Sequence, residues 1–210
     1  MKGLYFISHP TERFSTLDSI KIALTGGCKQ IQLRMKETSR EEFMDTAREA
    51  LKLCKTHNAD LFINDEVSIC KDIKAKGVHL GKKDLSPAKA RETLGKDFII
   101  GGTANSWEDI LFLQQEGVDY IGLGPYRYTT TKKELAPLLG LEGYKRILTL
   151  CRRNKLEIPI LAIGGITASD IPELLKMGVS GIALSSSILK AENPIEETRK
   201  IINLIQKIKR

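Results

Sequence analysis

The sequence contains no long hydrophobic run. None of its 210 residues belongs to a stretch that approaches the roughly 18 consecutive apolar residues needed for a membrane-spanning helix. The apolar run at residues 4–7 is too short for the hydrophobic core of a secretory signal. We therefore expect a cytoplasmic protein that has no membrane partner.

Cysteine and histidine are both sparse and scattered. The four cysteines form no CxxC pair and lie in helical patterns or at their borders, so we expect reduced structural thiols. They are Cys28, Cys54, Cys70 and Cys151. The three histidines are equally dispersed, which disfavours a zinc site. No Ser-His-Asp or Cys-His arrangement points to nucleophilic catalysis.

The formal net charge of +7 favours an anionic partner, either a nucleic acid or a phosphorylated small molecule. Part of this excess lies on the C-terminal amphipathic helical pattern, where a solvated basic face is the ordinary explanation. The sequence has neither a basic stripe interleaved with aromatic residues nor a recognition-helix motif, which disfavours nucleic acid. Small phosphorylated substrates are therefore the expected partners.

Short apolar segments alternate with longer helical patterns along the whole chain, and no linker divides it. Strands are predicted at 4–8, 30–34, 60–63, 77–80, 99–103, 120–123, 160–163 and 181–184. Helices are predicted at 16–25, 40–57, 67–75, 87–94, 106–116, 141–154, 168–177 and 194–207. Eight βα units of about 26 residues each (210/8) favour an α/β fold, a single-domain (β/α)8 TIM barrel over 1–210. An open doubly wound sheet is the alternative, but no GxGxxG opens the first helix.

The residues at the expected helix boundaries agree with this pattern. Ser86 followed by Pro87 is typical of a helix start, with a capping hydroxyl and a proline at the first helical position. Gly77, Gly117 and Gly178 stand where helices are expected to stop.

Charged residues gather where the second, third and fourth predicted strands end. The side chains of a strand alternate, so Gln32, Arg34 and Lys36 point the same way, toward the mouth of the predicted barrel. Asp65 and Asp84 follow the next two strands at the same level. Mg²⁺ usually takes one or two carboxylates together with water and phosphate oxygens. The pattern therefore predicts a metal-assisted diphosphate site.

A second group of residues follows the last three predicted strands. The loop at 124–140 is long for a compact domain, and its hydroxyls and lysines suit a lid over phosphate. Gly164 and Gly165 allow close approach of the backbone to a ligand, and Ser185 and Ser186 open onto a helix. The loops after strands seven and eight are a frequent phosphate site in such barrels. We expect a second, metal-free anion site here.

The ordered motifs of the chain resemble those of the thiamine phosphate synthase family over almost its whole length. They are "QLRMK" at 32–36, "ND" at 64–65, "GVHLGKKDL" at 77–85, "IIGGTANS" at 99–106, "DYIGLGP" at 119–125, "TTTKK" at 129–133, "AIGGI" at 162–166 and "GIALSSSI" at 181–188. As an ordered set these motifs are highly specific.

The resemblance implies a role for each matched residue. Residues matched to the pyrimidine diphosphate are Gln32, Arg34, Lys36, Asn64 and Lys132, with Thr103 where the family commonly has serine. Residues matched to the Mg²⁺ ion are Asp65 and Asp84, and those matched to the thiazole phosphate are Thr129, Thr131, Gly165 and Ser186. Catalysis is assigned to Arg34, Lys36, Lys132 and Thr103.

The resemblance implies that a pyrimidine diphosphate is joined to a thiazole phosphate, with release of pyrophosphate through a dissociative step. It also leaves a homodimer open. Several positions depart from the family pattern, namely Ser8-His9, Glu66, Asn105 and Arg127. The related thiazole tautomerases form one alternative, but they carry a histidine near Asn105 and tend to lose the metal aspartates, which this chain keeps. A non-catalytic regulator with a phosphate pocket is the other alternative.

Overall fold

Eight parallel strands close into a barrel in the order of the sequence, as predicted. The computed structural model describes residues 1–129 and 136–208. The strands are β1 Gly3–Ile7, β2 Gln30–Leu33, β3 Asp60–Asn64, β4 Gly77–Leu80, β5 Ile99–Ala104, β6 Tyr120–Leu123, β7 Ile160–Ile163 and β8 Gly181–Leu184. The first and last strands pair along four residues, which closes the sheet without an exposed edge.

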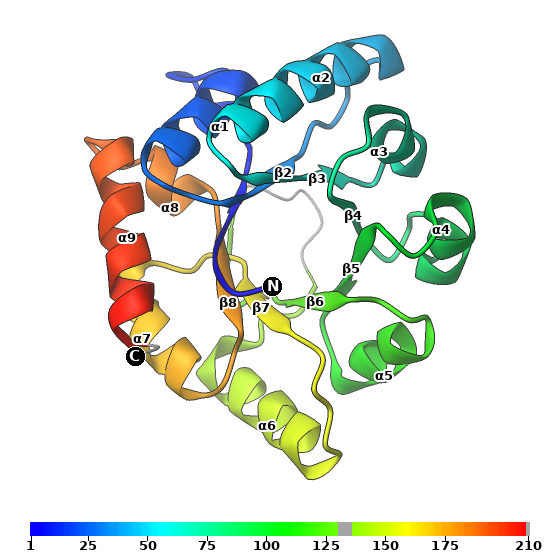
Figure 1. The fold of residues 1–210 in the computed structure, drawn as a ribbon. Coiled ribbons are helices and arrows are strands. Elements are labelled where there is room, and N and C mark those ends of the chain that lie inside the picture. The colour runs from blue at the N-terminus through cyan, green and yellow to red at the C-terminus, as the bar shows by residue number, and fades with distance from the viewer. Residues whose placement is uncertain (130–135, 209–210) are drawn as a thin grey trace.

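The helices form a ring around the barrel, with the strands at its centre (Figure 1). They are α1 Thr16–Thr25, α2 Arg40–Thr56, α3 Val67–Ile73, α4 Pro87–Leu94, α5 Trp107–Gln115, α6 Gly140–Arg153, α7 Ile171–Lys176, α8 Ser186–Leu189 and α9 Pro194–Ile208, with a 3₁₀ turn η1 at Ala168–Asp170. Serines at four N-caps accept a hydrogen bond from the third helical residue, which satisfies an otherwise unpaired amide. Within the described residues no helix is both long enough and apolar enough to cross a bilayer.

Two predicted helices differ from the structure by more than one residue at an end. Gly77 does not cap α3 but is the first residue of β4, where an added Cβ would lie 2.0 Å from the carbonyl oxygen of Ile99. The helix ends instead at Lys74, which takes the left-handed conformation at φ 53°. The helix predicted at 168–177 is split into η1 and α7: Thr167 and Asp170 form a capping box on the 3₁₀ turn, and α7 begins at Ile171 with Pro172 in its first turn. Gly117 and Gly178 do follow helix ends, both with positive φ.

The apolar residues divide into two cores, as expected when side chains alternate along barrel strands. The larger core lies between the sheet and the helices and includes Leu33 and Ile63. The smaller one consists of interior residues, among them Tyr5, Phe62 and Tyr120. Alternation along each strand therefore supplies both the helix-facing core and the filling of the barrel.

Candidate active site

A chain of hydrogen bonds runs through the barrel interior. The Gln32 amide donates to the Tyr5 hydroxyl at 3.4 Å, and the hydroxyls of Tyr5 and Tyr120 lie 2.9 Å apart. The Tyr120 hydroxyl is 3.1 Å from Nδ1 of His79, whose Nε2 is 3.0 Å from the Thr103 hydroxyl. Both end residues were predicted at the site. The three in the middle were missed, although Tyr5 and Tyr120 are the polar aromatics on otherwise apolar strands.

Most of this row of hydrogen-bonded side chains is buried away from water. Gln32 is 2% exposed and Tyr5 is 1% exposed. Burial raises the pKa of Tyr5 and of Tyr120, so both phenols stay neutral. A buried polar group that keeps its partners specifies one arrangement, because leaving any member unpaired costs free energy. The chain therefore holds the Gln32 amide and the Thr103 hydroxyl in fixed positions.

Arg34 follows β2, and its backbone amide is held by a side chain at the end of the neighbouring strand β1. The buried Ser8 hydroxyl accepts a hydrogen bond from the Arg34 amide at 2.9 Å, in line with the backbone bond from Ser8 to Gln32. Burial lowers the pKa of the Arg34 guanidinium, and the nearby Asp65 carboxylate opposes that shift. Burial, together with Arg34 and Lys190, also lowers the pKa of His9. Ser8 thus extends the β1–β2 pairing and positions Arg34.

Asp65 and Asp84, here called the aspartate pair, come together from different strand ends. Asp65 takes a left-handed conformation at φ 66°, its amide donates to the His79 carbonyl at 2.9 Å, and its carboxylate is ion-paired with Lys36. The carboxylate of Asp84 accepts from the Gly81 amide at 2.7 Å. Burial and then the adjoining Asp65 carboxyl raise the pKa of Asp84. The sequence prediction that these two carboxyl groups converge agrees with this geometry.

The aspartate pair fits a hard divalent cation. Two carboxyl groups close enough to raise the pKa of one of them concentrate negative charge that a cation would relieve. No cluster of three or more His, Cys, Asp or Glu side chains suited to a metal occurs among the described residues. Two protein carboxylates, with the other positions left to water and phosphate, suit Mg²⁺ better than a metal caged wholly by protein.

The ends of β7 and β8 present neutral hydrogen-bonding groups. Gly164 and Gly165 have φ values of +93° and +65°, and an added Cβ at Gly165 would lie 2.6 Å from the Tyr128 carbonyl oxygen. The hydroxyls of Ser185 and Ser187 are buried without a hydrogen-bond partner in the described parts of the chain. We call Gly165, Ser185 and Ser186 the phosphate cradle. The unpartnered Ser185 hydroxyl of the cradle is a donor or acceptor that a ligand would satisfy.

Two of the remaining predicted residues, Asn64 and Thr129, are described by the structure. Asn64 ends β3 and is buried next to Asp65, as its predicted role requires. Thr129 lies on the segment that leaves β6 and is partly buried. Thr131 and Lys132 lie outside the described residues.

The positions that depart from the family pattern have identifiable contacts in most cases. The Asn105 amide donates to the Gly124 carbonyl and so ties the end of β5 to the end of β6. The guanidinium of Arg127 pairs with Asp170 at 2.5 Å. Glu66 precedes α3 without a capping hydrogen bond from its side chain. Asn105 and Arg127 therefore support the walls of the mouth.

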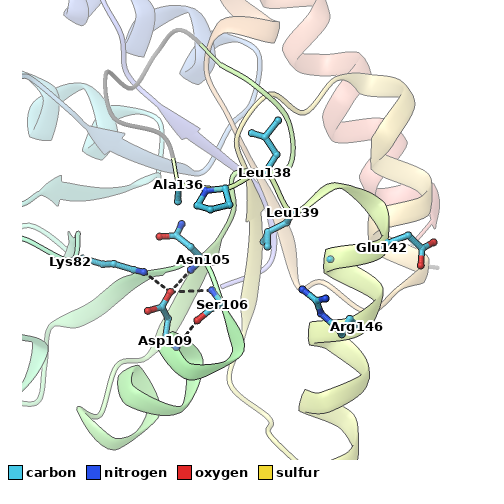
Figure 2. A pocket seen from close by; sticks show the side chains of 11 residues that line it. Lys82, Asn105, Ser106, Asp109, Ala136, Leu138, Leu139, Glu142 and Arg146 are labelled. Atoms are coloured by element: carbon cyan, nitrogen blue, oxygen red, sulfur yellow. Dashed lines mark hydrogen bonds and ion pairs between the residues drawn. The ribbon is translucent and has the colours of Figure 1, made fainter.

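A cavity of about 700 Å³ lies on the flank of the mouth, between the start of α5 and α6 (Figure 2). Lys82 pairs with Asp109 at 2.6 Å on one wall, and Glu142 and Arg146 stand on the other. None of the described lining residues belongs to the aspartate pair or to the phosphate cradle. The cavity is therefore separate from the groups that carry the predicted chemistry.

The known proteins that this chain resembles in sequence and in fold carry the names of one enzyme family. A family model described as thiamine monophosphate synthase matches residues 4–188. The thiamine-phosphate synthases of Bacteroides fragilis and Bacteroides thetaiotaomicron are each 52% identical, over 204 and 209 residues, and cover 97% and 100% of this chain and 100% of their own. The structure of a thiamine phosphate pyrophosphorylase from Pyrococcus furiosus superposes with a TM-score of 0.85 at 30% identity, covering 98% of this chain and 96% of that one. The chain therefore belongs to the thiamine-phosphate synthase family, transferases of thiamine biosynthesis.

Proposed function

We propose that the chain condenses 4-amino-2-methyl-5-(diphosphooxymethyl)pyrimidine with 4-methyl-5-(2-phosphoethyl)thiazole, or with its carboxylated form, in the presence of Mg²⁺. The products are thiamine phosphate and pyrophosphate, together with carbon dioxide when the thiazole is carboxylated. The observation that carries this proposal is the aspartate pair at the mouth, which gathers two carboxyl groups beside Arg34 and Lys36. A diphosphate-bound cation is the ligand that satisfies both the carboxylates and the basic side chains.

In this proposal the two substrates occupy opposite sides of the mouth. The diphosphate is bound by Arg34, Lys36 and the aspartate pair, and Lys132 is expected to reach it from the loop after β6. The pyrimidine is oriented by Asn64, Gln32 and Thr103, the last two held by the buried hydrogen-bond chain. The thiazole phosphate binds at the phosphate cradle, with Thr129 and Thr131 closing over it.

The reaction breaks one C–O bond and forms one C–N bond. The bond between the pyrimidine methylene and the diphosphate oxygen breaks, and its electron pair leaves with pyrophosphate. The thiazole nitrogen then donates its lone pair to the methylene carbon and becomes the quaternary nitrogen of the product. With the uncarboxylated thiazole no proton transfer is needed, so the reaction requires no catalytic triad.

The protein accelerates this reaction through charge and position. Arg34 and Lys36 stabilise the negative charge that accumulates on the departing diphosphate, because preorganised cations bind the transition state more strongly than the ground state. Mg²⁺, where it binds, would supply Lewis-acid stabilisation of the same charge. The buried hydrogen-bond chain and the phosphate cradle hold the two rings against each other, which lowers the entropic part of the barrier.

One assay tests the proposed function. Purified protein is mixed with the two substrates and Mg²⁺, and thiamine phosphate and pyrophosphate are followed by chromatography. We expect both products in equal amounts and their loss on addition of EDTA. Conversion of the thiazole substrate between tautomers without any condensation would instead support the tautomerase alternative. Ligand binding without turnover would support a regulator.

Two further properties stay predictions from the sequence. They are a cytoplasmic location, which is expected, and a homodimeric assembly, which the resemblance leaves open. Size-exclusion chromatography with light scattering measures the assembly directly.

A further inference from the structure

The two ends of the segment after β6 are joined by hydrogen bonds. We call these joined ends, residues 125–127 and 139–140, the neck. The Leu139 amide donates to the Pro125 carbonyl at 2.9 Å, and the Gly140 amide donates to the Tyr126 carbonyl at 3.0 Å. These two bonds bring the residues that leave β6 next to those that begin α6. Thr129 lies on the segment that leaves this neck, and Thr131 and Lys132 lie outside the described residues.

The neck is attached to the end of β7. The Tyr126 amide donates to the Ile163 carbonyl and the Arg127 amide to the Gly164 carbonyl, both at 2.9 Å. A Cβ added at Gly165 would lie 2.9 Å from the Cβ of Arg127, so the neck and the phosphate cradle touch without spare room. A shift of the neck by a few tenths of an ångström would therefore displace the residues of the cradle.

One ion pair fastens the side chains of these two loops. The Arg127 guanidinium donates to Asp170 at 2.5 Å and lies over the Tyr126 ring, 4.9 Å from its centroid. The same Asp170 oxygen accepts from the Thr167 amide at 2.9 Å and the Thr167 hydroxyl at 2.8 Å. Asp170 is only 7% exposed. Burial alone would raise the pKa of Asp170, but these hydrogen bonds and Arg127 lower it, so the carboxylate is charged.

We propose that the Arg127–Asp170 ion pair is a positioning device that holds the base of the loop after β6 against the phosphate cradle, and thereby sets the affinity for the thiazole phosphate. Asp170 is the fixed end, because Thr167 holds it independently. Arg127 is the movable end, because half of its side chain is exposed and, among the described residues, its guanidinium contacts Asp170 and the Tyr126 ring. The inference rests on the proposed placement of the thiazole phosphate at the cradle.

The expected effect exceeds that of an ordinary surface pair. Exposed ion pairs are worth little, whereas a charged hydrogen bond to a buried carboxylate is worth more. For Arg127→Met we expect the dissociation constant of thiazole phosphate to rise about tenfold, which equals about 1.4 kcal/mol. The pyrimidine diphosphate should change by less than about threefold, because its main contacts lie across the mouth.

The experiment measures each substrate separately by calorimetry and steady-state kinetics in Arg127→Met, Arg127→Lys, Asp170→Asn and the Arg127→Met/Asp170→Asn double variant. We expect Arg127→Lys to recover part of the loss and the double variant to be no worse than Asp170→Asn alone. Arg91→Met is the matched control. Arg91 forms a 2.6 Å ion pair with Asp119, and this pair lies away from the neck and the cradle. This control should lower the melting temperature without changing the thiazole phosphate affinity.

The outcomes separate this inference from the proposed function. Unchanged thiazole phosphate affinity in Arg127→Met, or an equal loss for both substrates, would overturn the positioning role. The same result as Arg91→Met, a lower melting temperature alone, would also overturn it and leave the pair purely structural. Ser186→Asp tests the cradle itself. Normal thiazole phosphate binding in that variant would remove the proposed site, and the inference with it.

Discussion

The two sides of the barrel mouth differ in the groups that they offer to the proposed anionic ligands. The side near β2, β3 and β4 is charged, and its groups are already engaged, as in the Lys36–Asp65 ion pair and the Gly81–Asp84 hydrogen bond. The side near β7 and β8 presents glycine backbone and buried serine hydroxyls that lack partners in the described structure. The first side must rearrange charges when a ligand binds. The second has hydrogen-bonding groups without partners in the described residues, and its Arg127–Asp170 ion pair lies at the base of the neighbouring loop.

This difference matches the charge of the two proposed ligands. A diphosphate that departs during the reaction gains charge, so cations and a metal are useful where it leaves. A phosphate monoester that only anchors its substrate needs binding without a change of charge, and neutral donors supply it. Interactions between charges are also screened by salt more than neutral hydrogen bonds are. We therefore expect variants on the charged side to lower turnover and variants on the neutral side to weaken binding of the thiazole phosphate.

The largest effect is expected at the aspartate pair. The Asp65→Ala/Asp84→Ala variant should lose turnover by roughly 1000-fold, since metal stabilisation of a leaving phosphate is worth several kcal/mol. Circular dichroism should show an intact fold, because both residues lie at the functional end of the barrel. Asp72→Ala, which removes an exposed carboxylate paired with Arg40, is the control and should be fully active. Undiminished turnover of the double variant in EDTA would exclude the metal role.

Arg34 is expected to come next. Arg34→Ala should lower kcat/KM by roughly 100-fold, because a charge-assisted contact worth about 1.5–3 kcal/mol strengthens as the diphosphate leaves. Arg34→Lys should also be impaired, since an ammonium group does not reproduce the planar guanidinium. Arg40→Ala, an exposed arginine on α2, serves as the control. Wild-type kinetics in either Arg34 variant would mean that the side chain does not reach the diphosphate.

Ser186→Asp tests whether the two sides are independent. A carboxylate at the phosphate cradle should repel the incoming phosphate and weaken thiazole phosphate binding by about 100-fold. The pyrimidine diphosphate affinity should change much less, since its cations lie on the opposite side. Ser186→Ala, which removes the hydroxyl without adding charge, should have a far smaller effect. Calorimetric titration of each substrate alone measures both values, and an equal loss of the two affinities would contradict the two-sided mouth.

The smallest effect concerns pH. Burial and Asp65 raise the pKa of Asp84, so in the metal-free protein this group releases its proton at a higher pH than in the unfolded chain. The metal-free fold should therefore lose some stability as pH rises from the ordinary carboxyl value to the raised one. Mg²⁺ binds the deprotonated form, so its affinity should rise over the same window, by about tenfold per pH unit or less.

Calorimetry with Mg²⁺ at a series of pH values provides the measurement. Asp84→Asn serves as the reference, because it keeps the shape of the side chain and removes the titrating proton. The pH dependence in this window should disappear in that variant. A dissociation constant for Mg²⁺ that does not vary with pH in the unsubstituted protein would show that Asp84 is not a ligand.

Much of the fold was predictable because its signals are local. Short apolar segments between helical patterns indicated all eight strands, and capping serines such as Ser86 indicated helix starts. The end of α3 was predicted wrongly, because left-handed Lys74 replaces the expected glycine and Gly77 is required by its contact with Ile99. That contact joins two strands and leaves no mark on the sequence around Gly77.

The amino-acid sequence by itself determined the barrel and the convergence of Asp65 with Asp84, and it predicts the two groups of anion-binding residues. All three follow from strand period and from the rule that parallel strand ends share one face. Only the tertiary structure decided which polar groups pair across that face. Tyr5 and Tyr120 are 115 positions apart, and Arg127 and Asp170 are 43 apart. Such pairs form because closing the barrel brings distant side chains together and burial penalises any that lack a partner.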